Sequence, residues 1–373
     1  MKLSLFLSSV AVFLSFAAQT QDVSPYTFSS VQLVESTKAK DQCNTGTCWS
    51  YSTTSFLESE IIRLGKGSHD ISEMYNVRMT YPKKAERFVR FQGKAQFGPG
   101  SLNHDVINVV RDYGMVPDAV YSGLKNGMSE HDHTEMDAML EGMLKALIEK
   151  RTAGAGNSYL TAVEGVLEAY LGEAPEQFTY NGKSYTPASF RDAMGIKPND
   201  YVSLTSFSHH PFYQSFVLEV PDNFSGGSYW NVTIDELEKT VVDALSKGFS
   251  VAWDADVSER GFSFRNGVAI LPQADVARED YFKKIVPEIV VTQVNRQEGF
   301  DNYQTTDDHL MHIVGTAKDQ NGGLYFVIKN SWGEGNPHQG YQYISSAYFR
   351  MKTVGILLHK DAVPSAIKSK LKL

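Results

Sequence analysis

The stretch DQCNTGTCWSY occupies residues 41–51 and carries the most informative pattern in the chain. Gln42 lies six residues before Cys48, a glycine lies two residues before it, and Trp49 follows it directly. A cysteine that acts as a nucleophile needs a thiol that can lose its proton and donors that stabilise the oxyanion it creates. The thiol of Cys48 and the side-chain amide of Gln42 are groups of these two kinds.

Two runs far downstream supply the remaining parts of such a site. His309 lies in the run DDHLM at residues 307–311, and Asn330 lies in the run IKNSWG at residues 328–333. An imidazole near a thiol can act as its base, and an amide can hold the imidazole in the required orientation. This chain order predicts nucleophilic catalysis, with Cys48, His309 and Asn330 as the catalytic residues.

These motifs resemble the papain superfamily of cysteine peptidases. In that signature a small residue precedes the cysteine and an aromatic residue follows it, and Thr47 and Trp49 take these places. Thr45 stands where the family motif has a disulfide-forming cysteine, so the resemblance predicts no such bond here. Cys48 and His309 are separated by 309 − 48 = 261 residues, against roughly 130–150 in the short papain form, which indicates an insertion of domain size.

Blocks within this insertion resemble the branch of the superfamily that contains bleomycin hydrolase and aminopeptidase C. The resemblance extends from about Gln42 to about Lys368. It implies an enzyme that acts on peptide substrates without a metal or an organic cofactor. The blocks that carry it are ISE (71–73), DYGMVP (112–117), TPASF (186–190), NDYVSL (199–204), YWNV (229–232) and GFSVAWDADV (248–257).

The resemblance implies an α+β fold of the papain type, with a helical lobe and a β-rich lobe facing each other across a cleft. We expect a signal peptide at residues 1–20 and one peptidase domain at residues 21–373. Within this domain the helix-rich lobe, enlarged by a helical insertion, should cover about 40–250, and the β-rich lobe about 250–360.

Hydrophobic periodicity agrees with this division, because helical spacing dominates the first part of the chain and strand-like runs dominate the last third. Asn103 and Thr233 are the expected N-caps of two helices, and Glu236 occupies the capping-box position behind Thr233. A turn rich in helix breakers is expected at 154–157. The predicted helices are residues 48–64, 103–113, 134–151, 158–171 and 233–247, and the predicted strands are 251–253, 285–291, 309–317, 324–330 and 341–344.

His312 competes with His309 for the role of the base. Residues three apart on a strand point to opposite faces, so only one of the two can face the thiol. In the resembled family the base lies six residues before a glycine, and Gly315 follows His309 by 315 − 309 = 6 residues. We therefore predict His309 as the base, and we expect His312 in the core or on the outer face.

The resemblance also assigns three supporting residues. Gln42 should place its side-chain amide beside the backbone N–H of Cys48, so that both donors bind the oxyanion of the tetrahedral intermediate. Trp332 resembles the indole that shields the His–Asn bond from water, and with Gly100 it is expected to line the substrate site. Gly100 falls where the family has a glycine pair along the cleft, although an ordinary turn explains this glycine equally well.

The 373-residue chain has a net charge of −8 and only two cysteines. It lacks the basic excess that a broad nucleic-acid footprint requires, so no nucleic-acid partner is expected. A disulfide between Cys43 and Cys48 would consume the nucleophile, so both are expected as free thiols. The segment HDH at 131–133 lacks the pattern of a third ligand, so no metal site is expected there.

The N-terminus is typical of a secreted protein. Lys2 is followed by a mostly apolar stretch at residues 3–18, which predicts a signal peptide; a buried first helix is the alternative. The stretch is too short for a stable membrane span, and no cysteine for a lipid anchor precedes Cys43. Secretion without disulfides favours a bacterial periplasm or exterior.

The combined motifs predict peptide-bond hydrolysis through an acyl-enzyme intermediate. A papain-like acyltransferase and a catalytically silent peptide-binding protein are the alternatives, and the intact catalytic set argues against the silent form. In the resembled branch a C-terminal arm enters the cleft, and its carboxylate engages the free amine of the substrate. The segment 359–364 resembles the start of this arm, but the tail at 368–373 is basic and a poorer partner for an ammonium group. Aminopeptidase and endopeptidase activity both stay open, as does a homo-oligomer.

Overall fold

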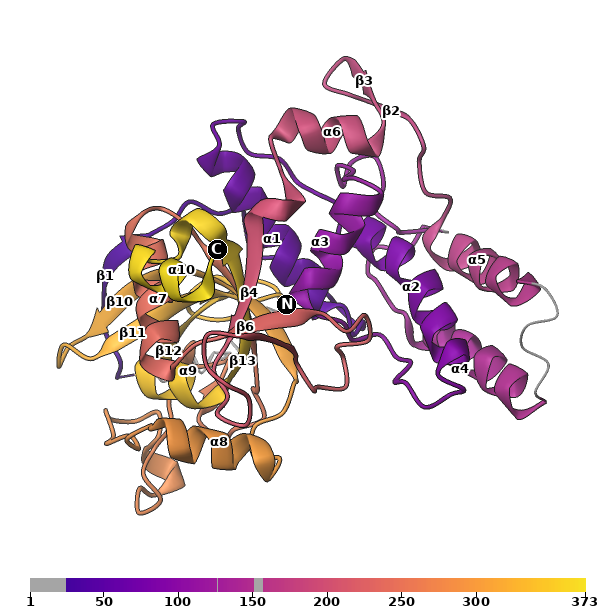
Figure 1. Ribbon diagram of the computed structural model, residues 1–373. Coiled ribbons are helices and arrows are strands. Elements are labelled where there is room, and N and C mark those ends of the chain that lie inside the picture. The colour runs from indigo at the N-terminus through magenta and orange to yellow at the C-terminus, as the bar shows by residue number, and fades with distance from the viewer. Residues whose placement is uncertain (1–24, 126, 151–156) are drawn as a thin grey trace, which may run out of the picture.

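The computed structural model describes residues 25–125, 127–150 and 157–373. The predicted signal peptide lies outside this part of the chain, and so does most of the turn predicted at 154–157. The described residues form a mixed α+β structure, in which a helical region lies beside a region built on one large sheet (Figure 1). Within these ranges no helix is long and apolar enough to cross a membrane.

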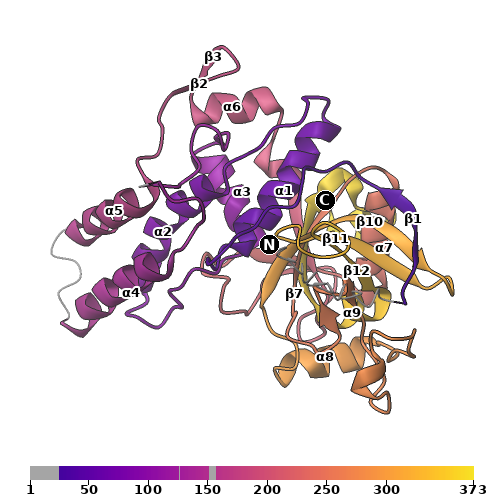
Figure 2. The ribbon, with the colours of Figure 1, turned by 180° about the vertical axis from the view of Figure 1, so that it is seen from behind.

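The helical region consists of six helices and a short hairpin. Figures 1 and 2 both show α4 and α5 extending away from the sheet, on the side opposite to the C-terminus. Buried side chains of all six helices share one hydrophobic core, which also includes Ala252 and Leu310 of the sheet. The elements are α1 (Cys48–Arg63), α2 (Glu73–Arg90), α3 (Asn103–Asp112), α4 (Thr134–Glu149), α5 (Ser158–Leu171), α6 (Pro187–Met194), β2 (Phe178–Tyr180) and β3 (Lys183–Tyr185).

The sheet region contains one eleven-stranded sheet with the order β5-β6-β4-β13-β7-β10-β11-β12-β9-β8, in which β1 also pairs with β10. Paired strands are antiparallel except β4 with β6 and β9 with β12. The strands are β1 (Phe28–Leu33), β4 (Tyr201–Thr205), β5 (Ser215–Val217), β6 (Ser228–Asn231), β7 (Val251–Ala255), β8 (Phe262–Ser263), β9 (Val268–Ala269), β10 (His309–Asp319), β11 (Leu324–Lys329), β12 (Tyr341–Ser345) and β13 (Thr353–His359).

Further helices pack around this sheet. A second core joins apolar residues of α7, α9 and α10 to side chains of the central strands, such as Trp253, Phe326 and Ile356. In both views α8 lies at the end of the sheet region that is remote from α6 (Figures 1 and 2). These elements are α7 (Ile234–Ser246), α8 (Gln293–Asp301), α9 (Ser346–Lys352), α10 (Ser365–Leu371) and the short 3-10 turns η1 (Pro198–Asp200), η2 (Arg278–Asp280) and η3 (Lys360–Ala362).

Helix capping confirms one predicted cap and corrects another. Thr233 caps α7, because its hydroxyl accepts from the Glu236 N–H and the Glu236 carboxylate accepts from the Thr233 N–H at 3.2 Å. The prediction of Asn103 as a cap is wrong, because Asn103 lies inside the first turn of α3 and donates to Thr53 Oγ1 at 2.9 Å. The Asp105 carboxylate caps that turn instead, accepting from the N–H of Leu102 at 3.2 Å.

The predicted strand at 285–291 is also wrong. Only an isolated bridge between Pro272 and Glu288 forms there. Pro287 has no N–H to give to a ladder, and the Glu288 carboxylate accepts from the Ser345 hydroxyl at 2.6 Å instead. The sequence also missed β13, which lies between β4 and β7. Strands between residues 201 and 231 belong to the sheet as well, so the strand-rich part begins earlier than the expected position near 250.

The other four predicted strands and the five predicted helices are present, with ends shifted by a few residues. The contacts between α1 and β10 determine where Cys48 lies along the sheet. Ser55 Oγ is 2.8 Å from His312 Nδ1, and Ser52 Oγ donates to the Met311 carbonyl at 2.5 Å. One turn further toward the helix N-terminus, the thiol of Cys48 meets the backbone N–H of Leu310. The N-terminus of α1 therefore lies beside the beginning of β10.

The C-terminal helix α10 is anchored on the sheet region. Ile367 and Leu371 are buried in the core that contains α7. Lys370 Nζ forms an ion pair with Glu236 at 2.5 Å and lies 3.1 Å from the hydroxyl of Tyr213. The helix ends at Leu371, where Lys372 adopts a left-handed conformation and the Leu373 N–H donates back to the Lys368 carbonyl at 3.2 Å. Two of the basic side chains in this tail have acidic partners, Lys370 with Glu236 and Lys368 with Asp361.

Candidate active site

Cys48 is the first residue of α1, and its side chain is 8% exposed. The first N–H groups of a helix have no acceptor within the helix, and the helix dipole favours a negative charge at this end. Both cysteines are free thiols, and the second one, Cys43, is only partly buried. The helix terminus and the Leu310 N–H therefore both favour the thiolate form of Cys48.

His309 and Asn330 lie on neighbouring strands and contact each other. His309 Nε2 is 2.8 Å from Asn330 Oδ1. The orientation of the Asn330 amide is fixed, because its Oδ1 accepts from the Ser331 N–H at 2.7 Å and its Nδ2 donates to Gln342 Oε1 at 2.7 Å. An oxygen facing Nε2 requires a proton on Nε2, which leaves Nδ1 of the neutral ring free to accept a proton.

Trp332 covers this pair. Its ring stacks on the imidazole of His309 with 4.6 Å between centroids and an interplanar angle of 26°. Phe262 and Phe264 pack edge-on against the same indole. A hydrogen bond under an aromatic cover is stronger than one in contact with water, because the local dielectric constant is lower. Trp332 thus shields the imidazole. Its place along the substrate site stays a prediction.

Gln42 is held in place by hydrogen bonds at both ends of its side-chain amide. Ser331 Oγ donates to Gln42 Oε1 at 2.7 Å, and Gln42 Nε2 donates to the Thr45 carbonyl at 2.8 Å. One N–H of Nε2 stays available, and the backbone N–H of Cys48 has no acceptor within α1. These two groups are of the kind that an oxyanion hole requires.

Burial and charge act together on the nucleophile and its base. Burial, together with the smaller effects of the carboxylates of Asp307, Asp222 and Asp254, raises the pKa of the Cys48 thiol to about 12. Burial lowers the pKa of His309 to about 4, while the bond to Asn330 works in the opposite direction. At neutral pH the free protein therefore holds a neutral thiol at Cys48 and a neutral imidazole at His309.

Gly100 lies on a loop that is tied to two helices. Trp49 Nε1 donates to the Pro99 carbonyl at 2.9 Å, and the buried Lys84 ammonium donates to the Gly98 and Gly100 carbonyls. A Cβ at Gly100 would lie 1.9 Å from Asp222 Oδ2, so a larger residue would displace the Asp222 carboxylate from its present position. This residue is required for the close approach of Asp222, a reason that the sequence did not indicate.

Sequence reasoning missed several residues around the site. Ser331 holds Gln42, and Gln342 holds Asn330. Ser331 is part of the recognised NSWG run, so the motif itself could have pointed to it. Gln342 lies on β12 and carries no signal in the sequence. The same applies to Asp222, whereas Asp254 stands out in the sequence by its alternation with Asp256 on a strand; both lie within electrostatic reach of Cys48.

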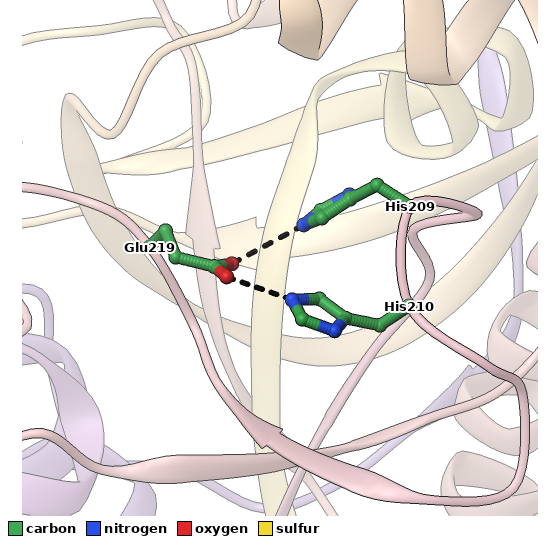
Figure 3. A group of neighbouring side chains, drawn as sticks. All are labelled: His209, His210 and Glu219. Atoms are coloured by element: carbon green, nitrogen blue, oxygen red, sulfur yellow. Dashed lines mark hydrogen bonds and ion pairs between the residues drawn. The ribbon is translucent and has the colours of Figure 1, made fainter.

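The side chains that could hold a metal ion lie elsewhere in the described structure. His209 Nε2 is 3.2 Å and His210 Nε2 is 2.7 Å from different oxygens of the Glu219 carboxylate (Figure 3). These three ligand atoms lie within 4.8 Å of one another. The group is partly exposed, and each imidazole already has Glu219 as its partner, so it is equally well explained as a polar contact at the base of the β5 hairpin. No catalytic step requires it.

Comparison with known proteins decides the family. The profile described as the peptidase C1-like family matches residues 77–373, which include His309 and Asn330, whereas Gln42 and Cys48 precede the match. The chain belongs to the peptidase C1-like family. It is a cysteine peptidase with a mixed α+β fold, as the resemblance to the papain superfamily predicted.

Similar proteins have names from the predicted branch. The chain is 24% identical over 360 residues to aminopeptidase G of Lactobacillus delbrueckii subsp. lactis, covering 86% of this chain and 80% of that protein. It is 24% identical over 372 residues to aminopeptidase C of Listeria innocua, covering 88% and 81%. Human bleomycin hydrolase is 23% identical over 295 residues, covering 70% of this chain and 62% of that protein.

A solved structure shares the fold. The crystal structure of pepW from Lactobacillus rhamnosis superposes with a TM-score of 0.72 at 18% sequence identity, covering 92% of this chain and 84% of the other. Both the family prediction and the fold-class prediction are therefore confirmed.

Proposed function

We propose that this cysteine peptidase hydrolyses peptide bonds with Cys48 as the nucleophile, His309 as the base and Asn330 as the group that orients the base. The observation that carries the proposal is the bond of His309 Nε2 to Asn330 Oδ1, because it leaves Nδ1 as the proton acceptor. Silent peptide-binding proteins need no such tautomer, so this bond favours hydrolysis over simple binding.

In the proposed reaction, Nδ1 of His309 takes the proton of the Cys48 thiol, and the thiolate attacks the carbonyl carbon of the scissile bond. The imidazolium then gives its proton to the leaving amine, which produces a thioester between Cys48 and the acyl part of the substrate. Water, deprotonated by the same imidazole, cleaves the thioester and restores the thiol. Trp332 keeps the His309–Asn330 pair dry during both steps.

The substrates are peptides, and the names of the similar proteins favour removal of single N-terminal residues. Endopeptidase activity is the second candidate, because α10 is held beside α7 by the ion pair of Lys370 with Glu236 and by the shared core. Export through the signal peptide expected at residues 1–20 remains part of the proposal.

Alkylation of the protein tests the proposed nucleophile. Treatment with iodoacetamide at neutral pH, followed by peptide mapping, should show that modification of Cys48 parallels the loss of peptidase activity. Modification of the more exposed Cys43 should leave activity intact. If activity is lost while Cys48 stays unmodified, the proposed mechanism fails. A mass-spectrometric profile of products from a peptide library then distinguishes N-terminal from internal cleavage.

Gln42→Ala should lower kcat by about 10²–10³, because one oxyanion donor is lost. Ser331→Ala is the matched variant, since it removes the bond to Gln42 Oε1 and keeps the Nε2 donor. We expect Ser331→Ala to retain most of the activity that Gln42→Ala loses. Steady-state kinetics on one peptide substrate compares the two, and equal losses would show that Gln42 acts only by holding the loop.

A further inference from the structure

Three carboxyl groups from separate segments gather beside the catalytic residues. Asp307 lies two residues before His309. Asp254 lies on β7, directly across from Leu310 of β10. Asp222 follows β5 and packs against Gly100. The proposed mechanism uses none of these three side chains.

The three carboxyls form one group. The carboxyl of Asp254 contacts that of Asp307, and both lie within electrostatic reach of Asp222. Asp254 points toward the helical region, because it shares a face of β7 with Ala252, which belongs to the core around α1. Its side chain is fully buried. All three Asp side chains also lie within electrostatic reach of the thiol of Cys48, and Asp254 pairs across the sheet with Leu310, whose N–H meets that thiol.

The pair of Asp254 and Asp307 has no counter-ion in the described part of the protein. Apart from the bond between the two carboxyls and the backbone N–H of Asp222 beside Asp307, no donor meets its oxygens there. Asp222 is different, since its Oδ1 accepts from Gln96 Nε2 at 2.6 Å and its charge is offset by the ammonium of Lys84. Buried carboxyls normally have donors or counter-ions, and a pair without a counter-ion requires an explanation.

Burial and mutual repulsion raise the pKa of Asp307 to about 7 and that of Asp254 well above its usual range, so the pair shares a proton in the free enzyme. The negative charge that remains opposes catalysis. Negative charge beside a thiol disfavours the thiolate that must attack the substrate. A cation that binds among the three carboxyls would remove this opposition and would supply the counter-charge that Asp254 and Asp307 lack. Such a cation would have to arrive with the substrate, because the described residues supply none for this pair.

We propose that Asp222, Asp254 and Asp307 form a cation subsite that binds the α-ammonium group of the peptide substrate. The proposal rests on the proposed function and selects its aminopeptidase form. In an N-terminal residue only two bonds separate the α-nitrogen from the carbonyl carbon, about 2.5 Å. An α-ammonium must therefore bind immediately beside the nucleophile, which is where this subsite lies. The ammonium of a lysine side chain is several bonds further away.

The subsite also gives a reason why the enzyme should prefer substrates with a free N-terminal amine over N-acetylated ones. A free amine brings the positive charge that lowers the cost of forming the Cys48 thiolate, whereas an acetylated amine brings none. The carboxylates of Asp254 and Asp307 hold the ammonium by charge-assisted hydrogen bonds, which are stronger than neutral ones. The subsite should therefore act both in binding and in activation of the thiol.

The test compares alanine 7-amido-4-methylcoumarin with its N-acetyl form on the wild-type protein and on Asp254→Asn/Asp307→Asn. We expect the wild type to prefer the free amine, and we expect the double variant to lose about ten- to a hundredfold of this preference in kcat/KM. Asp275→Asn, which removes one exposed carboxylate outside the site, is the matched control and should keep the preference. A second pair, N-acetyl-Lys-Ala and N-acetyl-norleucyl-Ala coumarin amides, tests a lysine side chain as the source of the cation.

Three results would overturn the proposal: equal rates for both alanine substrates with the wild type, an unchanged preference in the double variant, or a preference confined to the lysine pair. Hydrolysis of either substrate by the wild type would still support the proposed function, so the subsite proposal and the proposed function can fail separately. Should the double variant not fold, protection of wild-type Cys48 from iodoacetamide decides. Alaninamide should protect and N-acetylalaninamide should not, and equal protection would contradict the subsite.

Discussion

Cys48→Ala is expected to lower kcat/KM by about 10⁴-fold or more and to leave the protein folded. No other group in the site can form the acyl intermediate, so only binding and the oxyanion donors remain. Alanine is a good helix former, and the change removes a single sulfur at the first position of α1. Peptidase assays and circular dichroism together measure the two expectations.

Cys43→Ala is the matched control, because Cys43 is the second of the two cysteines and lies five residues earlier. Its thiol is partly exposed and meets only backbone groups, the Asp41 carbonyl at 3.6 Å and the His131 backbone. This variant should keep nearly all of the activity. Retention of most activity by Cys48→Ala, or a comparable loss in Cys43→Ala, would show that the nucleophile has been assigned wrongly.

The fold was predictable where the hydrophobic pattern coincides with burial. α7 has apolar residues at helical spacing and a complete capping box, and β11 is a continuous apolar run. α2 was missed because polar residues interrupt its buried face. Asn76, Arg78 and Lys84 are buried on it, and their tertiary contacts are encoded by no local pattern. β13 was missed although it is apolar, because it follows α9 without a turn signal.

The candidate site was predictable to the extent that it lies in short motifs. The runs around Cys48 and Asn330 define residue types and order, and the structure brings His309 and Asn330 within hydrogen-bond distance. The surrounding shell was not predictable. Gln342 reaches Asn330 from β12, and Asp254 reaches Asp307 from β7, because strands far apart in sequence are neighbours in the sheet. Such juxtapositions depend on sheet order and register.

His309→Ala is expected to lower kcat/KM by about 10⁴-fold, because the thiol of Cys48 loses its proton acceptor while burial keeps its pKa at about 12. Asn330→Ala should reduce the rate less, since the imidazole persists and loses only its orientation. Peptide hydrolysis by the three proteins, measured at one pH near neutrality, gives this ranking. A loss for Asn330→Ala larger than that for His309→Ala would contradict the proposed roles.

His312→Asn separates the chemistry from the fold, because His312 lies three residues away on the same strand and on its opposite face. Its Nδ1 bonds to Ser55 Oγ at 2.8 Å, and burial holds its pKa well below the usual value. The substitution should therefore lower the thermal midpoint by several degrees through loss of packing against Phe56, while kcat per folded molecule changes little. His309→Ala should show the reverse, with stability nearly kept and chemistry lost. If His312→Asn instead abolished turnover in folded protein, His312 would have to be the base. The catalytic face of β10 would then be the face that carries His312 and not the face that carries His309.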